Sequence, residues 1–94
     1  MLTHEEISRA VVRVASVFPV KRAAYFGSYA EGRQSETSDL DILLEFHHSK
    51  VSLITLSAIK NDLEDQLNIP VDVIHAPIPN DSLIKIGKVV QVYG

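Results

Sequence analysis

The chain has 94 residues, a length that fits one globular domain spanning residues 1–94. It contains no cysteine, which excludes disulfides, thiol nucleophiles and Cys-based zinc sites, and it has no run of about 20 apolar residues that would span a bilayer. A formal charge of −3 with scattered basic residues argues against an extended nucleic-acid footprint, because such binding depends on Lys and Arg that neutralise phosphates.

A capping motif stands near the N-terminus. The first ten residues, MLTHEEISRA, carry acids and lack the apolar run of a signal peptide, which predicts a cytoplasmic protein. Within them, Thr3 and Glu6 have the Thr-x-x-Glu spacing of a capping box, in which each side chain bonds the backbone of the other residue. Apolar residues at helical spacing follow, so we expect a helix from about residue 5 to residue 17, ended by Pro19.

A short strand and a glycine-serine turn come next. Residues 23–26, Ala-Ala-Tyr-Phe, are typical of a buried strand, and it ends at Gly27. Ser28 and Glu31 repeat the capping spacing, so we expect a short helix that begins at Ser28 and is capped by its side chain. Free N–H groups at the start of a helix attract anions, which makes Gly27 and Ser28 a candidate phosphate-binding turn.

Two aspartates stand at the beginning of a second predicted strand, residues 38–46. Asp39 and Asp41 are two positions apart, so their side chains share one face of the strand. Two carboxylates held this close repel each other, and an arrangement that keeps both ionised is usually explained by a bound divalent cation with oxygen ligands.

The second half of the sequence predicts a helix, a third strand, a short helix and a closing strand rich in valine. The first of these helices is capped by Ser52 and ends near Asn68. Residues 70–74, Pro-Val-Asp-Val-Ile, form the third strand with Asp72 at its centre, and the short helix covers residues 83–86. This order favours an α/β (α+β) fold, a small mixed β-sheet flanked by helices.

Asp72 supplies a third carboxylate when its strand pairs beside the strand of the other two acids. Three carboxylates across neighbouring strands suit two-metal nucleotidyl transfer, in which one ion activates the incoming hydroxyl and the other neutralises the triphosphate. We therefore predict Asp39, Asp41 and Asp72 as catalytic and metal-binding residues, with Gly27 and Ser28 holding the phosphates. The alternative for an Asp-x-Asp pair alone is a solvated strand end, which the combined pattern disfavours.

The combined pattern resembles a known family. Gly27-Ser28, ten intervening residues and Asp39-x-Asp41, followed by Asp72, look like the signature of the minimal nucleotidyltransferase (MNT) domains of the DNA polymerase beta-like superfamily. The likeness covers nearly the whole chain. It implies ATP as the nucleotide substrate and two Mg²⁺ ions as cofactors. In the family, the residues at Asp39 and Asp41 bind Mg²⁺, and the residue at Asp72 binds metal while it serves as a base or orients the acceptor.

The resemblance also implies a partner. Many MNT proteins resemble antitoxins encoded beside a HEPN-domain ribonuclease toxin, and some transfer AMP to a tyrosine of that toxin. We therefore expect Mg²⁺-dependent AMP transfer from ATP to a HEPN toxin, within a hetero-oligomer. Two alternatives stay open: a non-catalytic antitoxin or binding module that neutralises its partner by forming a complex, and an enzyme that modifies a small molecule such as an aminoglycoside.

A few other residues bear on these predictions. The family often has Arg where this chain has Glu31, which places a negative charge near bound phosphates, and Arg33 is the candidate compensating charge. Tyr29, next to Ser28, is the tyrosine best placed to stack on a base, although core packing is the commoner role. We expect His75 to be an ordinary residue at a strand end.

Overall fold

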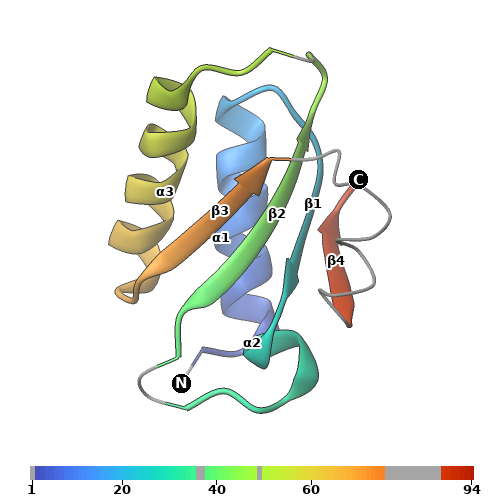
Figure 1. The fold of residues 1–94 in the computed structure, drawn as a ribbon, viewed down its shortest axis with the longest axis vertical. Helices are drawn as coiled ribbons and strands as arrows, with labels where there is room; N and C mark the ends of the chain where they lie inside the picture. The colour runs from blue at the N-terminus through green and yellow to red at the C-terminus, as the bar shows by residue number, and fades with distance from the viewer. Residues whose placement is uncertain (1, 36–37, 49, 76–87) are drawn as a thin grey trace.

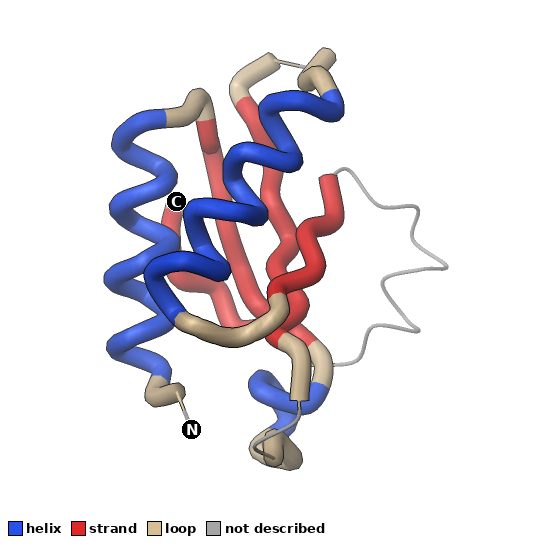
Figure 2. The backbone as a smooth tube through the Cα atoms, turned by 90° about the vertical axis from the view of Figure 1, so that its left-hand side faces the viewer, coloured by secondary structure: helices blue, strands red, loops and turns tan. Residues whose placement is uncertain are grey.

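The chain folds into one mixed β-sheet with two long helices packed on the same face, as the computed structural model shows (Figures 1 and 2). The structure describes residues 2–35, 38–48, 50–75 and 88–94. Its elements are α1 (His4–Val17), β1 (Val20–Phe26), α2 (Ser28–Glu31), β2 (Leu40–Phe46), α3 (Leu53–Leu67), β3 (Val71–His75) and β4 (Val89–Tyr93).

The strand order is β3-β2-β1-β4. β1 runs antiparallel to both β2 and β4, whereas β2 and β3 are parallel. The predicted fold class, a small mixed sheet flanked by helices, is therefore confirmed. Within the described ranges, no helix is long and apolar enough to cross a membrane.

The first helix begins with the predicted capping box. The N–H of Glu6 donates to Thr3 Oγ1 at 3.2 Å, and the N–H of Thr3 donates to Glu6 Oε1 at 3.1 Å. Ile7, Val11 and Val14 recur every three or four positions along α1 and are almost completely buried. This apolar stripe joins the core between the helices and the sheet.

The third helix is the crossover between the parallel strands β2 and β3. Its first turn is capped as predicted, because the N–H of Thr55 donates to Ser52 Oγ at 3.1 Å. It ends at Asn68, which adopts the left-handed conformation with φ of 59°. Ile59 and Leu63 are completely buried, so α3 is held against the sheet through its middle turns. Parallel neighbours require such a connection.

Some boundaries differ from the predicted ones. β1 begins at Val20 rather than at residue 23, because Val20 is buried and pairs with Phe46. β2 begins at Leu40 rather than at residue 38, so Asp39 lies immediately before the strand. The predicted short helix over residues 83–86 lies outside the described residues.

The two faces of the sheet differ in character. The side chains of β2 that point toward α1 and α3 are buried, namely Leu40, Ile42, Leu44 and Phe46. The alternate residues Asp41, Leu43 and Glu45 are half-buried and point to the opposite side. We call this side, turned away from α1 and α3 and toward the viewer in Figure 1, the front face.

Substitution of two leucines of α3 should distinguish its buried turns from its exposed first turn. Leu63 is 0% exposed and Leu53 is 80% exposed, so the buried side of α3 does not extend to its first turn. We expect Leu63→Ala to lower the free energy of unfolding by about 2–5 kcal/mol, and Leu53→Ala to change it by no more than about 0.5 kcal/mol. Urea unfolding followed by circular dichroism measures both, and equal effects would contradict this assignment of the core.

Candidate active site

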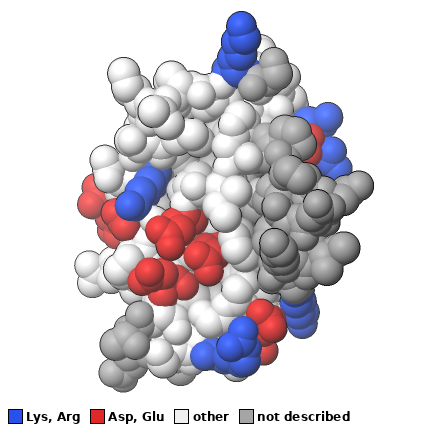
Figure 3. Space-filling view, in the orientation of Figure 1, with Lys and Arg blue, Asp and Glu red and all other residues white. Residues whose placement is uncertain are grey.

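Two aspartates lie directly opposite each other on neighbouring strands. In the parallel register of β2 and β3, Asp41 pairs with Asp72, and both side chains therefore point to the front face. Asp39 lies two positions before Asp41 and is exposed. Burial raises the pKa of Asp41, and the charges of Asp72 and Asp39 raise it further. Figure 3 shows acidic side chains gathered on this face. The fold thus pairs Asp41 with Asp72 and keeps Asp39 near enough for its charge to act on Asp41.

The register that creates this pairing is fixed at the start of β3. The N–H of Val71 donates to Glu64 Oε2 at 2.9 Å, which ties the strand to α3. The N–H of Leu40 donates to the Pro70 carbonyl at 3.1 Å, which ties the same point to β2. Asp72 directly follows Val71. A shift of β3 by one residue along β2 would break both hydrogen bonds and would move Asp72 away from Asp41.

Gly27 lies against the Asp41 carboxylate. It follows Phe26, the residue of β1 that pairs with Asp41, and it adopts φ 76° and ψ −148°, a conformation open essentially only to glycine. A Cβ atom at Gly27 would collide with Asp41 Oδ2. The absence of a side chain at Gly27 therefore lets the Asp41 carboxylate lie directly against the backbone, and the predicted phosphate-binding turn adjoins Asp41.

The start of the short helix differs from the prediction. α2 begins at Ser28, but its N-cap is Gly27, so the predicted capping box between Ser28 and Glu31 is wrong. The positive φ of Gly27 makes it the non-helical capping residue and moves Ser28 into the first turn. The Glu31 carboxylate instead accepts a hydrogen bond from Arg33 Nη2 at 3.1 Å. Arg33 is thus placed to offset the charge of Glu31, as expected.

The chemistry of the acids suits Mg²⁺. Carboxylate oxygens are the donors that this cation prefers. A cation would relieve the repulsion from Asp72 and Asp39, which adds to the effect of burial in raising the pKa of Asp41. In the part of the chain that the structure describes, however, no three His, Cys, Asp or Glu side chains are grouped closely enough to hold a metal ion. The backbone pairs Asp41 with Asp72 and brings Gly27 against Asp41, and the metal-binding roles of Asp39, Asp41 and Asp72 stay predictions.

The aromatic and histidine side chains near the acids are engaged in packing contacts. Tyr29 is 8% exposed and belongs to the core, so it is not available to stack on a bound base. Tyr25 is also buried, and its hydroxyl lies 2.8 Å from His4 Nδ1. His75 meets the ring of Phe46 edge-on at 5.2 Å between ring centroids. These contacts agree with the packing roles that we expected.

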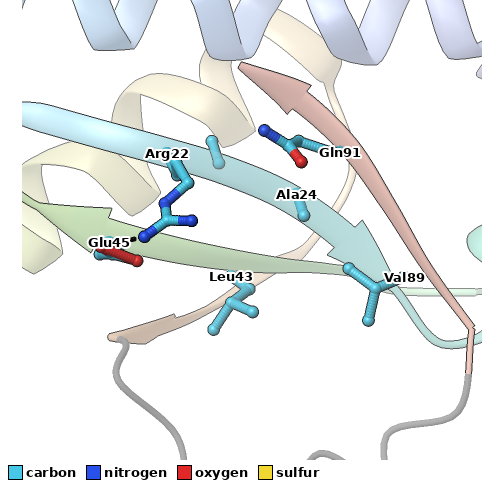
Figure 4. Close-up of a pocket in the computed structure, with 7 residues that line it drawn as sticks. Arg22, Ala24, Leu43, Glu45, Val89 and Gln91 are labelled. Carbon is cyan, nitrogen blue, oxygen red and sulfur yellow. Dashed lines mark hydrogen bonds and ion pairs between the residues drawn. The ribbon is translucent and has the colours of Figure 1, made fainter. Parts of the chain in front are cut away.

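A pocket on the front face was missed from the sequence. It has a volume of about 200 Å³ and is formed by β1, β2 and β4 (Figure 4). Leu43 and Glu45 in its wall are the next alternate residues of β2 after Asp41. This alternation is the sequence signal that could have placed them on the same face of the sheet as Asp41. Its other side depends on the pairing of β1 with β4, which local patterns do not reveal.

Comparison with known proteins gives one family. Residues 6–91 match the family model described as "Nucleotidyltransferase domain". A protein of Methanocaldococcus jannaschii named "Putative protein adenylyltransferase" is 48% identical over 69 residues, which is 73% of this chain and 73% of the relative. A Thermococcus cleftensis protein named "Protein adenylyltransferase MntA" is 35% identical over 78 residues, covering 79% of this chain and 78% of the relative.

Solved structures with a similar fold include toxin–antitoxin complexes. A chain in a crystal structure of a toxin–antitoxin with AMP-PNP gives a TM-score of 0.79 at 20% identity, over 93% of this chain and 73% of that chain. A chain in the structure of a tri-AMPylated Shewanella oneidensis HEPN toxin in complex with an MNT antitoxin gives a TM-score of 0.71 at 16% identity. The match covers 98% of this chain and 73% of that chain. At these identities the likeness is one of fold.

The close approach of Gly27 to Asp41 predicts an unequal response of two glycines to substitution. Gly27 and Gly32 both have positive φ, but nothing lies within 4 Å of a Cβ at Gly32. We expect Gly27→Ala to destabilise the fold by about 1–3 kcal/mol, and Gly32→Ala to cost less, about 1 kcal/mol. Thermal melting of both variants provides the comparison. A smaller loss for Gly27→Ala than for Gly32→Ala would contradict the collision.

The raised pKa of Asp41 predicts that removal of its carboxylate increases the stability of the fold by an amount that depends on pH. Ionisation of Asp41 costs folding free energy, and this cost grows as the pH rises through the acidic range. Asp41→Asn should therefore stabilise the fold at neutral pH by roughly 0.2–1 kcal/mol, the range for cross-strand pairs. The gain should fade below the ordinary aspartate pKa of about 3.9.

Thermal melts across this pH range in chelator-containing buffer measure the gain. Asp65→Asn, at an exposed position of α3, is the matched control and should show little change at any pH. A variant Asp41→Asn that melts below the wild-type chain at neutral pH would refute the repulsion.

Proposed function

Because the chain belongs to the nucleotidyltransferase domain family, we propose that it transfers AMP from ATP to a hydroxyl of a protein partner, a tyrosine of a HEPN toxin. In this proposal it is the antitoxin of a toxin–antitoxin module. The observation that carries the proposal is the pairing of Asp41 with Asp72, together with the close approach of Gly27 to the Asp41 carboxylate. The predicted resemblance to minimal nucleotidyltransferases and the predicted enzyme class are confirmed by the family match and the named relatives.

The phosphates of ATP are assigned to the turn after β1. Gly27 allows a phosphate to approach the backbone closely, and the Ser28 hydroxyl has no hydrogen-bond partner among the described residues. Asp39, Asp41 and Asp72 would hold two Mg²⁺ ions, which supply neutralisation of the triphosphate and activation of the acceptor hydroxyl. Such a compensating cation suits the binding of a polyanionic substrate to a chain with a net charge of −3.

The proposed transfer is a nucleophilic displacement at the α-phosphorus of ATP. The acceptor oxygen forms a bond to the α-phosphorus while the bond between that phosphorus and the bridging oxygen to the β-phosphate breaks. Pyrophosphate leaves from the side of Gly27 and Ser28. We assign to Asp72, which is exposed on the front face opposite Asp41, the roles of orienting the hydroxyl and accepting its proton.

The partner and the nucleotide are supported by similar proteins. The toxin–antitoxin structure with AMP-PNP supports ATP as substrate, and the complex of the AMPylated HEPN toxin supports a HEPN protein in a hetero-oligomer. The two relatives named as protein adenylyltransferases support a protein acceptor over a small molecule. The cytoplasmic location belongs to the same proposal.

Labelling with radioactive ATP tests the activity. The wild-type chain, incubated with Mg²⁺ and a HEPN toxin, should transfer the α-phosphate label to the toxin. Asp39→Asn, Asp41→Asn and Asp72→Asn should each reduce the initial rate by at least about 100-fold, because each removes a charge that the transition state requires. Asp65→Asn on α3 is the matched control and should retain the wild-type rate. Undiminished labelling by the three variants would overturn the assignment.

One observation favours a second candidate, the non-catalytic antitoxin. In the described ranges the acidic side chains are not grouped as a metal site, although the backbone opposes two of them. A chain with all three aspartates changed to asparagine separates the candidates. If it still binds the toxin but no longer suppresses its ribonuclease activity, catalysis is required; if suppression persists, neutralisation is by complex formation.

A further inference from the structure

The front-face pocket begins one row of the sheet away from Asp41. Phe26 pairs with Asp41 on one side and with Val89 on the other, which forms one row across the sheet. In the next row, Ala24 pairs with Leu43 and with Gln91. Figure 4 shows Leu43, Val89, Gln91 and Arg22 surrounding Ala24. Among the described residues, neither Phe26 nor Asp41 lines the pocket, which therefore lies beside the row of Asp41 along β1 and β2.

The size and lining of the pocket limit what it holds. Its volume of about 200 Å³ is below the range of about 300–1,000 Å³ that is typical of sites for drug-sized ligands, so it fits one side chain or ring and not a whole nucleotide. Ala24, Leu43 and Val89 make its floor and walls apolar, and the small Ala24 side chain provides the depth.

Polar groups stand only at the rim. Arg22 Nη2 donates to Glu45 Oε2 at 2.9 Å, and Lys21 Nζ lies 3.7 Å from the same oxygen. Gln91 Nε2 donates to the carbonyl of Gly94 at 2.6 Å, which leaves the side-chain oxygen of Gln91 as an acceptor. An apolar floor with donors and an acceptor at its edge suits an aromatic side chain carried by a peptide backbone.

The direction of the reaction identifies which substrate uses the pocket. In nucleotidyl transfer the attacking and leaving oxygens lie roughly in line on opposite sides of the phosphorus. Gly27 and Ser28, assigned to the leaving pyrophosphate, lie beyond the C-terminal end of β1. Ala24 lies on the other side of the row that contains Phe26 and Asp41. The incoming hydroxyl thus approaches from the pocket side.

We propose that this pocket holds the acceptor side chain, a tyrosine whose ring lies over Ala24 between Leu43 and Val89 and whose hydroxyl points toward Asp41. The proposal rests on the proposed AMP transfer and names the acceptor subsite for it. A serine or threonine side chain is too short to fill the apolar floor. The rim groups of Arg22 and Gln91 are then placed to bond the backbone of the acceptor segment.

Nuclear magnetic resonance titration tests the subsite without requiring turnover. Two probes are added to the labelled full chain: N-acetyl-L-tyrosinamide, and AMP-PNP with Mg²⁺. We expect the tyrosine probe to shift the backbone amide signals of Ala24, Leu43 and Val89, and the nucleotide to shift those of Gly27 and Ser28. Nucleotide shifts centred on the pocket, or no tyrosine-induced shifts there, would overturn the proposal.

A pair of valine variants tests the same subsite in the reaction. Val89 is 40% exposed in the wall of the pocket, and Val12 is 43% exposed on α1. Val89→Trp fills the pocket and should raise the KM for the tyrosine-bearing acceptor about tenfold or more while the KM for ATP changes by less than about twofold. Val12→Trp is the matched control and should leave both constants unchanged.

The outcomes separate this proposal from the proposed function. Absence of AMP transfer by the wild-type chain would reject the activity, and the titration would still decide whether the pocket binds a tyrosine ring. Transfer by the wild-type chain with an unaltered acceptor KM in Val89→Trp would reject the subsite alone. A raised KM for ATP in that variant would show that the pocket belongs to the nucleotide and would also reject the proposal.

Discussion

The parallel pairing of β2 with β3 is the constraint on which the candidate site depends. It places the Asp41 and Asp72 carboxylates directly opposite each other, an arrangement that costs folding free energy because like charges repel across strands. The pairing persists because the opposite sides of the same strands are buried: Leu40, Ile42 and Val71 are at most 1% exposed. Hydrophobic burial on one face thus holds an electrostatically unfavourable arrangement on the other.

The two faces of the sheet therefore have different roles, one in stability and the other in the candidate site. The face toward α1 and α3 supplies nearly all of the buried apolar surface and with it the stability of the fold. The front face carries the acids, the turn at Gly27 and the pocket over Ala24, none of which is needed to form the core. The residues of β2 show this difference directly, because each buried residue that packs against the helices is followed by a half-buried residue on the front face.

Local patterns predicted most of the site, and the remainder depended on backbone geometry and long-range pairing. Asp39, Asp41 and Asp72 were identified as candidates because period-two spacing and flanking apolar residues are visible in a short window. The start of β1 was missed because Lys21 and Arg22 are both exposed and a bulge interrupts the register beside them. The cap at Ser28 was wrong because the spacing does not reveal the positive φ of Gly27, which takes the capping position.

The crossover through α3 also sets the order in which the three acids of the candidate site are brought onto the sheet. Asp39 and Asp41 precede this helix in the chain and Asp72 follows it, so a polypeptide emerging from the ribosome presents the first two acids well before the third. Closing this long loop is entropically costly and delays parallel pairing relative to local contacts. The nascent chain therefore presents all three acids on one sheet only after α3 has docked and β3 has paired with β2.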